Sequence, residues 1–272
     1  MSGNVTEKVD LYTSAYANYE LDAYRQTRIE TYGEDLGQTS WVTPAEADAI
    51  PRLLDLSSDS SVLEIGCGSG RYALRLAEKI GCRVLGLDIN TNGIGNANEL
   101  ASQKNLESLV RFEVCDASRP LPFAEGDFDA VFSNDALCHI PGRAALFARI
   151  HRVLKPGGRL LFSDALIIGG VISQQEIAAR SSIGYYLFSP PAENERLLEN
   201  AGFRIISAQD TTGSAADISM RWHEARRKHA QEMTEAEGAE GFAGLQQFLL
   251  SVHNLTADRR LLRILYLARK EQ

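Results

Sequence analysis

The sequence predicts a doubly wound α/β fold with a mostly parallel sheet of seven strands. From residue 61 onward, short apolar runs alternate with longer stretches of helical spacing, and a glycine-rich turn follows the first apolar run. Strands of about 5–6 residues that alternate with helices of about 10–15 residues are typical of βαβ units, whose crossovers are right-handed. Because 44% of the 272 residues are hydrophobic, the chain can bury a full core.

The expected elements follow one another in a regular order. Strands are predicted in SVLEIG, CRVLGLDI, VRFEVCDA, FDAVFSND and RLLFSDAL. The helices between them are predicted in RYALRLAEKIG, which Gly81 closes, in TNGIGNANELASQKN, and in GRAALFARIHRVL, which the sequence KPGG ends. A further helix in PAENERLLENAGF leads to a strand in RIISAQDTT, and RLLRILYLARK is the predicted final strand.

Helical segments are expected to flank this core. The prediction divides the chain into an N-terminal helical cap, a cofactor-binding core, a helical insertion and a final core strand, over residues 1–45, 46–213, 214–257 and 258–272. The insertion is expected to hold two helices that are broken near Gly238 or Gly241. Tyr12, Tyr16 and Tyr19 share one face of the first helix, where they are predicted to anchor it.

The composition narrows the class of partner. A formal charge of −8 argues against a nucleic-acid partner. The first residues have no apolar leader segment and no apolar run is long enough to span a bilayer, so we expect a cytoplasmic protein without a membrane partner. The cysteines are scattered without ligand spacing, so reduced thiols and no metal site are expected. The oligomeric state stays open.

The turn after the first strand contains three glycines at alternate positions, Gly66, Gly68 and Gly70. Such a turn exposes backbone N–H groups to a ligand, but the dinucleotide pattern G-x-G-x-x-G fails because its third glycine falls on Arg71. Glu64 would repel a pyrophosphate and favour an amino group. Asp88 ends the second strand, where a carboxylate can accept both hydroxyls of a ribose. The sequence therefore predicts a nucleoside joined to an amino-acid-like end.

Five successive motifs extend this prediction, and their order and spacing resemble those of class I S-adenosylmethionine-dependent methyltransferases. The motifs are VLEIGCGSG, VLGLDI, VCDAS with LPF, FDAVFSNDALCHI and LKPGGRLLFSD, which cover residues 62–164. The resemblance implies a Rossmann-like core and S-adenosylmethionine as the cofactor. It further implies cofactor contacts through Glu64 and Gly66 at the methionine end, Gly68 and Gly70 in the turn, Asp88 at the ribose, Ile89, Asp116 and Ala117 at the adenine, and Asn134 at the methionine side.

The segment NDALCHI and the helical insertion are similar to small-molecule N-methyltransferases of the sarcosine/dimethylglycine and phosphoethanolamine type. This second resemblance implies a small-molecule acceptor and favours methyl transfer to an amine nitrogen. The alternatives are O- or C-methylation of a natural-product intermediate, a nicotinamide-dependent oxidoreductase, and a protein that binds the cofactor without catalysis.

The acceptor side is predicted from residues outside these motifs. His139 follows the fourth strand and is the candidate general base, with a structural role as the alternative. The candidate substrate-binding residues are aromatic or cationic: Trp41, Arg180, Tyr185, Tyr186 and Arg221. The insertion and the first helix are expected to form a lid that excludes water. The run RRKH, residues 226–229, is expected to lie on a solvated face.

Overall fold

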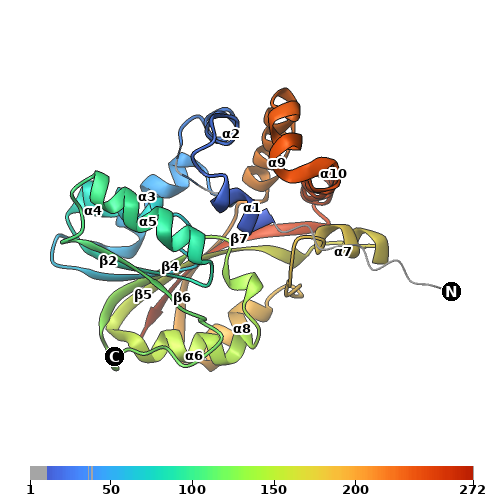
Figure 1. The fold of residues 1–272 in the computed structure, drawn as a ribbon. Coiled ribbons are helices and arrows are strands. Elements are labelled where there is room, and N and C mark those ends of the chain that lie inside the picture. The colour runs from blue at the N-terminus through green and yellow to red at the C-terminus, as the bar shows by residue number, and fades with distance from the viewer. Residues whose placement is uncertain (1–10, 36, 38, 272) are drawn as a thin grey trace.

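A seven-stranded sheet organises the computed structural model, which describes residues 11–35, 37 and 39–271. The strands are β1 (Ser61–Ile65), β2 (Arg83–Asp88), β3 (Val110–Val114), β4 (Phe128–Ser133), β5 (Leu154–Ile168), β6 (Phe203–Asp210) and β7 (Leu261–Lys270). They lie in the order β3-β2-β1-β4-β5-β7-β6. β7 runs antiparallel to β5 and β6, and the other neighbours are parallel. The predicted doubly wound, mostly parallel fold is therefore confirmed (Figure 1).

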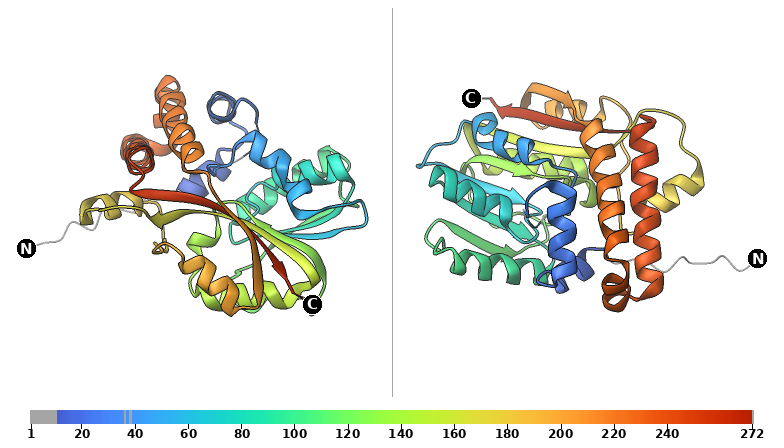
Figure 2. Two further views of the ribbon diagram at one scale, coloured as in Figure 1. Left: turned by 180° about the vertical axis from the view of Figure 1, so that it is seen from behind. Right: turned by 90° about the horizontal axis from the view of Figure 1, so that it is seen from above.

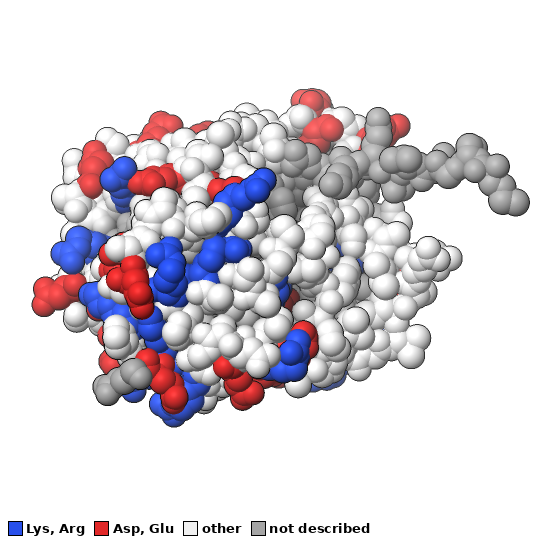
Figure 3. Space-filling view, turned by 90° about the horizontal axis from the view of Figure 1, so that it is seen from below, with Lys and Arg blue, Asp and Glu red and all other residues white. Residues whose placement is uncertain are grey.

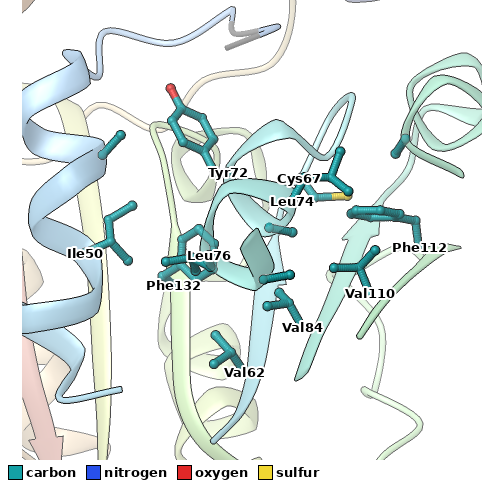
Figure 4. Packing of buried hydrophobic residues seen from close by; sticks show 14 of the residues in the cluster. Ile50, Val62, Cys67, Tyr72, Leu74, Leu76, Val84, Val110, Phe112 and Phe132 are labelled. Atoms are coloured by element: carbon teal, nitrogen blue, oxygen red, sulfur yellow. The ribbon is translucent and has the colours of Figure 1, made fainter. Parts of the chain in front are cut away.

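Helices cover both faces of the sheet (Figure 1). They are α3 (Pro44–Leu54), α4 (Arg71–Ile80) and α5 (Thr91–Gln103) on one face, and α6 (Arg143–Val153) and α8 (Glu193–Asn200) on the other. Each face buries an apolar cluster, and Figure 4 shows the first, with Ile50, Leu76 and Phe132 among its side chains. The central strands are buried on both faces, which explains why their sequences are almost continuously apolar.

The remaining helices gather above the carboxyl ends of the parallel strands. They are α1 (Leu11–Ala17), α2 (Asp22–Tyr32), η1 (Leu137–His139), α7 (Gln174–Arg180), α9 (Thr212–Lys228) and α10 (Ala230–Ala257). α9 packs between α2 and α10 (Figure 2). The chain leaves helical geometry at Gly238, as predicted, and a second break at His229 separates α9 from α10. The boundaries of cap, core and insertion stay a prediction.

Two local expectations about secondary structure are wrong. The sequence KPGG does not precede the fifth strand but lies inside it, because β5 begins at Leu154. The pairing of β5 with β4 shifts register there, and Gly157 has a φ of +78°, so an irregular stretch accommodates the proline within the strand. Tyr19 lies beyond the end of α1 at Ala17, and the Arg28 guanidinium lies 4.2 Å from the centre of its ring.

The expected solvated face at residues 226–229 is wrong for Arg226. Its side chain is buried, and its Nη1 and Nη2 donate to the Glu237 carboxylate at 3.0 and 2.6 Å. The hydroxyl of Tyr24 in α2 donates to the same carboxylate at 2.6 Å. Arg226 is buried because this face of α9 meets both α10 and α2, a tertiary contact that the local charge pattern does not reveal.

The charge of the surface and the apolar character of the helices relate to two predictions, the absence of a nucleic-acid partner and of a membrane partner. On the face formed by α6 and α8, basic and acidic side chains lie side by side, and this face shows no continuous basic area (Figure 3). None of the helices described here has both the length and the apolar character that crossing a membrane requires.

Candidate active site

A cavity of about 570 Å³ opens at the carboxyl ends of β1 to β4, and Tyr12 and Tyr16 of α1 form part of its wall. The carboxyl ends of parallel strands meet at one edge of such a sheet, where ligands bind. The volume lies within the range of about 300–1,000 Å³ that small-molecule and cofactor pockets occupy. Both tyrosines were expected only to anchor the first helix. They reach the cavity because α1 lies across the strand ends.

The glycine turn lets the backbone form the cavity floor. Gly66 has a φ of +77°, and a Cβ atom added there would lie 2.3 Å from the Cβ atom of Ala136. Gly66 and Gly68 both line the cavity, whereas Gly70 does not. A Cβ atom at Gly70 would meet the Phe112 ring at 2.5 Å, so this glycine permits close packing at the start of α4. Gly70 therefore lies outside the lining, and its predicted cofactor contact stays a prediction.

We expect Gly66→Ala to lower the free energy of unfolding by about 1–3 kcal/mol, because it combines a left-handed backbone with a steric clash. Gly95→Ala is the matched control. Gly95 lies on the exposed side of α5 with no atom within 4 Å of an added Cβ atom, so alanine should stabilise the helix by about 0.5–1 kcal/mol. Urea unfolding measures both values, and equal effects of the two substitutions would contradict the close approach at Gly66.

Asp88 lies at the end of β2 with each carboxylate oxygen held by one backbone donor. The N–H of Gly68 donates to Oδ2 at 2.8 Å, and the N–H of Asn90 donates to Oδ1 at 2.8 Å. Burial raises the pKa of Asp88 above its usual value, and these backbone donors oppose the rise. A carboxylate oxygen accepts more than one hydrogen bond, so both oxygens can still accept from two neighbouring hydroxyls. This geometry fits a ribose.

The ends of β2 and β3 form one side of the cavity. Ile89 is 70% exposed, and Ala117 is buried opposite it in the lining. Asp116 accepts from the Ser118 N–H at 2.9 Å, and hydrogen bonds from Ser118 lower the pKa of its carboxyl. An apolar wall beside an ionised acceptor fits a flat base with an exocyclic amino group. Asn134 lies past the end of β4, and its Nδ2 has no acceptor among the described residues.

Glu64 lies behind the glycine turn rather than in the cavity lining. Its side chain is fully buried, and neither carboxylate oxygen has a hydrogen-bond donor within the described part of the chain. Burial raises the pKa of Glu64 well above its usual value. Glu64 thus lies in β1 outside the lining, and its contact with the methionine end of the cofactor stays a prediction.

His139 closes η1 and contacts α1 across the cavity. The Tyr185 carbonyl lies 3.0 Å from Nδ1, and the Tyr12 hydroxyl lies 2.9 Å from Nε2. A carbonyl can only accept, so Nδ1 carries the proton and the hydroxyl of Tyr12 donates to Nε2. Burial, together with the positive charge of Arg180, lowers the pKa of His139 to about 4. His139 is therefore neutral at physiological pH.

A smaller cavity of about 10 Å³ adjoins the first and shares Tyr12 and His139 with it. Arg180 is 1% exposed and lines this smaller cavity. Its guanidinium lies 4.5 Å from the centre of the Tyr186 ring, which packs 4.3 Å from the His139 ring. Nη1 of Arg180 has no hydrogen-bond partner in the described residues, and none of their carboxylates pairs with it. A buried cation without a counter-ion is costly, so this arrangement suits an anionic ligand group.

Three of the predicted substrate-binding residues have side chains that do not line the large cavity. Arg221 is exposed on α9 and lies outside both cavities. The Tyr185 side chain is 49% exposed and also lies outside them, while its carbonyl contacts His139. Trp41 borders only the smaller cavity, and its ring packs against Trp222 at 5.9 Å. Helical spacing and motif position indicated the right segments here, but the side-chain directions depend on how α9 and α7 pack.

Asp135 is a site residue that the sequence analysis did not single out. It lines both cavities in a left-handed conformation, with a φ of +53°. Its Oδ1 accepts from Nε of Arg263 at 2.9 Å, and its Oδ2 accepts from the Trp41 N–H at 2.9 Å. Arg263 is fully buried and also donates to Glu46, so it links the site to α3 and β7. The available signal was an acidic residue two positions after the end of β4.

Comparison with known proteins identifies the family. Residues 63–162 match the family of methyltransferase domains. These residues form a methyltransferase domain. The matched residues span β1 to β5, which supply the glycine turn and the cavity floor of this methyltransferase domain. The family predicted from the five motifs is confirmed, and the alternative of a nicotinamide-dependent oxidoreductase is not supported.

Individual relatives extend the match beyond these residues. The chain is 36% identical over 159 residues to phosphoethanolamine N-methyltransferase 1 of Triticum aestivum, which covers 58% of this chain and 31% of that protein. It is 29% identical over 203 residues to 27-O-demethylrifamycin SV methyltransferase of Amycolatopsis mediterranei. This alignment covers 70% of this chain and 74% of that protein. The aligned part of this chain thus spans about a third of the Triticum relative and about three quarters of the Amycolatopsis one.

A solved structure aligns along nearly the whole chain. It is phosphoethanolamine N-methyltransferase 2 of Haemonchus contortus in complex with phosphomonomethylethanolamine and S-adenosylhomocysteine. The TM-score is 0.79 at 25% identity, with 96% of this chain and 61% of that chain covered. The alignment therefore includes the cap and insertion helices as well as the sheet.

Proposed function

We propose that this chain binds S-adenosylmethionine and transfers its methyl group to an amine nitrogen of a small molecule that also carries an anionic group. The observation that carries the acceptor class is the buried Arg180, whose Nη1 has no hydrogen-bond partner among the described residues, beside the hydrogen-bonded Tyr12 and His139. The family match and the geometry of Asp88 support the cofactor, and solved relatives are complexes with S-adenosylmethionine or S-adenosylhomocysteine.

The residues of the cavity have to position the reactants. The bound cofactor supplies a methyl group on a sulfonium, which is a good leaving group. Asp88 and the glycine turn hold the nucleoside side, and Tyr12 with His139 faces the acceptor side. Alignment of two reactants in this way can supply about 7–11 kcal/mol of the barrier. The covering helices exclude water from this centre.

Tyr12 and His139 can take the proton that an ammonium acceptor must lose before its nitrogen attacks. The Tyr12 oxygen donates its proton to Nε2 of His139 and keeps lone pairs that can accept from the acceptor. When the ammonium passes a proton to the Tyr12 oxygen, the hydroxyl proton of Tyr12 moves to Nε2. The phenol is restored and His139 becomes cationic. General-base catalysis of this kind contributes about 10²–10⁴-fold.

An anionic group on the acceptor would complete the charge balance of the site. A carboxylate or phosphate beside Arg180 would pair with its free Nη1 in a charge-assisted hydrogen bond. The same anion would offset the positive charge that helps to lower the pKa of His139. His139 would therefore become a stronger base when the acceptor binds.

A hydroxyl acceptor is the second candidate. Tyr12 and His139 could accept the proton of a hydroxyl by the same route, and one relative is named for O-methyl transfer. Transfer to carbon would not draw a proton from a nitrogen or an oxygen, and a protein that only binds the cofactor would need no base. These alternatives predict different results in the experiment below.

The test measures methyl transfer from S-adenosylmethionine to pairs of amines that differ only by a carboxylate or phosphate. We expect transfer to the anionic member of a pair. Arg180→Met should raise KM for that acceptor by about tenfold or more, since a hydrogen bond to a charged group contributes about 1.5–3 kcal/mol. Arg221→Met is the matched control, because this exposed arginine lies outside both cavities, and should leave KM unchanged.

Other outcomes decide against the proposal. Transfer to a matched alcohol but to no amine would establish the hydroxyl alternative. Equal use of neutral and anionic amines, with no effect of Arg180→Met on KM, would remove the anion from the acceptor class. Binding of the cofactor without transfer to any amine, alcohol or carbon acid would favour a non-catalytic protein.

A further inference from the structure

We propose that Arg71 binds the carboxylate at the amino-acid end of the cofactor. This inference rests on the proposed function, because it takes S-adenosylmethionine as the ligand of the large cavity. It assigns a role to the residue that stands where a dinucleotide-binding turn has its third glycine. The departure from the dinucleotide pattern would then supply the ligand contact that distinguishes the two cofactor classes.

The first argument is the charge of the cavity wall. Arg71 begins α4 directly after the glycine turn and lines the cavity. Among the described lining residues no other lysine or arginine occurs, whereas the charged acidic ones are Asp88, Asp116 and Asp135. The one carboxylate of the cofactor would be repelled at the strand ends that carry these acids and attracted only where Arg71 lies.

The second argument is that Arg71 shares its partner carboxylate, Asp35, with a second arginine. Asp35, the nearest carboxylate, already accepts from Nε and Nη2 of Arg28 at 2.7 and 3.1 Å. Arg71 approaches the same carboxylate only to 3.7 Å, beyond hydrogen-bond distance. Two arginines therefore share one carboxylate, and this cluster keeps a net positive charge beside the cavity.

The third argument is that the guanidinium is held in place. Nε of Arg71 donates to the hydroxyl of Tyr19 at 2.7 Å, and the side chain is 22% exposed. Tyr19 in turn stacks under Arg28 at 4.2 Å. Nη1 also donates to the backbone carbonyl of Asp35 at 3.4 Å, so each Nη group keeps at least one N–H for a ligand. An oriented guanidinium loses little rotamer freedom on binding. The neighbouring hydroxyls of Thr39 and Ser69 line the same part of the cavity.

The placement agrees with the length of the ligand. Asp88 and Asp116 hold the nucleoside side at the ends of β2 and β3, and the turn from Gly66 to Gly68 lies between these acids and α4. An amino-acid tail that leaves the ribose can therefore pass over the turn toward Arg71, while its sulfur stays near the β4 end. This path separates the carboxylate from Asp135.

The experiment compares S-adenosylmethionine with decarboxylated S-adenosylmethionine, which lacks only the carboxylate. Isothermal titration gives the dissociation constant of each ligand for each variant. For the unmodified chain we expect the ratio of the two constants to favour S-adenosylmethionine by about tenfold or more, as for a charge-assisted pair. Arg71→Met should bring this ratio close to one, and Arg71→Lys should keep part of it.

Arg75→Met is the matched control. Arg75 lies one turn further along α4, pairs with Glu34 and Asp48, and does not line the cavity. It should leave the ratio unchanged. Because both ligands meet the same variant, a general loosening of the cap by Arg71→Met would weaken both and leave their ratio intact.

An unchanged ratio in Arg71→Met would overturn the role of Arg71 and leave the proposed function standing. No binding of either ligand to the unmodified chain would overturn the cofactor assignment, and the present inference with it. Equal affinity of the unmodified chain for both ligands would show that no carboxylate site exists.

Discussion

His139→Ala is expected to lower kcat by about 10²-fold or more and to leave the affinity for the cofactor nearly unchanged. The substitution removes the acceptor at Nε2 for the Tyr12 proton, so the proton of the substrate has no route away from the reacting nitrogen. Tyr12→Phe should lower kcat to a similar extent, because it interrupts the same route. The double variant should be little worse than either single one, since the two groups act as a unit.

His253→Ala is the control for a general loss of a histidine. Nδ1 of His253 also lies against a backbone carbonyl, that of Ala216 at 2.9 Å, but the residue lies on α10 outside both cavities. Steady-state kinetics and cofactor titration measure the two effects separately. A loss of less than about threefold in kcat for His139→Ala would assign His139 a structural role, because it is below the usual range for a general base.

The low pKa of His139 also predicts how kcat/KM depends on pH. With a pKa of about 4, His139 is neutral in the free protein above that pH and becomes protonated only as the pH falls through it. The profile of kcat/KM should therefore have no acid limb near the ordinary imidazole value of about 6.5. An inflection near that value that disappears in His139→Ala would contradict the observed burial of the ring.

Asp88→Ala is expected to weaken the binding of S-adenosylmethionine by at least about 10²-fold. The substitution removes two hydrogen bonds from ribose hydroxyls to a charged acceptor, each worth about 1.5–3 kcal/mol. It also releases the N–H groups of Gly68 and Asn90, which Asp88 holds in the turn. Titration with cofactor measures the loss, and circular dichroism checks that the fold is intact.

Asp127→Ala separates the loss of the ribose hydrogen bonds from the release of a backbone N–H group. Asp127 also holds a backbone N–H group, that of Ala124 at 2.7 Å, but it lies in an exposed loop away from the cavity. This variant should bind the cofactor as the unmodified chain does. If Asp88→Ala bound the cofactor equally well, the ribose contact and the orientation of the cofactor in the cavity would both be wrong.

The sequence located those site residues whose position depends on a single short segment, such as a turn or a strand end. Gly66 and Gly68 lie between a strand and a helix, and Asp88 and Asp116 lie at strand ends, so their positions follow from the βαβ pattern. In a parallel sheet, the carboxyl ends of the strands meet at one edge whatever the loops do. The doubly wound, mostly parallel sheet and the family resemblance could be predicted for the same reason.

The parts that sequence reasoning missed arise from contacts between distant segments. Tyr12 reaches His139 across 127 positions, and Arg263 reaches Asp135 across 128. No periodicity relates these residues. The same holds for Arg71, whose position in the turn was recognised only as a departure from the dinucleotide pattern. Its partner carboxylate, Asp35, is shared with Arg28.

By itself, the sequence determined that this chain forms a doubly wound sheet and contains a methyltransferase domain. Alternating apolar runs and ordered motifs are local features, which the backbone geometry converts directly into βαβ units. Only the tertiary structure decided which side chains face the acceptor. The packing of α1 over the strand ends brings Tyr12 into the cavity, and the packing of α7 under α10 buries Arg180 without a counter-ion, whereas Arg221 stays exposed. Side-chain direction on a helix depends on which neighbour the helix packs against, and that neighbour lies far away in the chain.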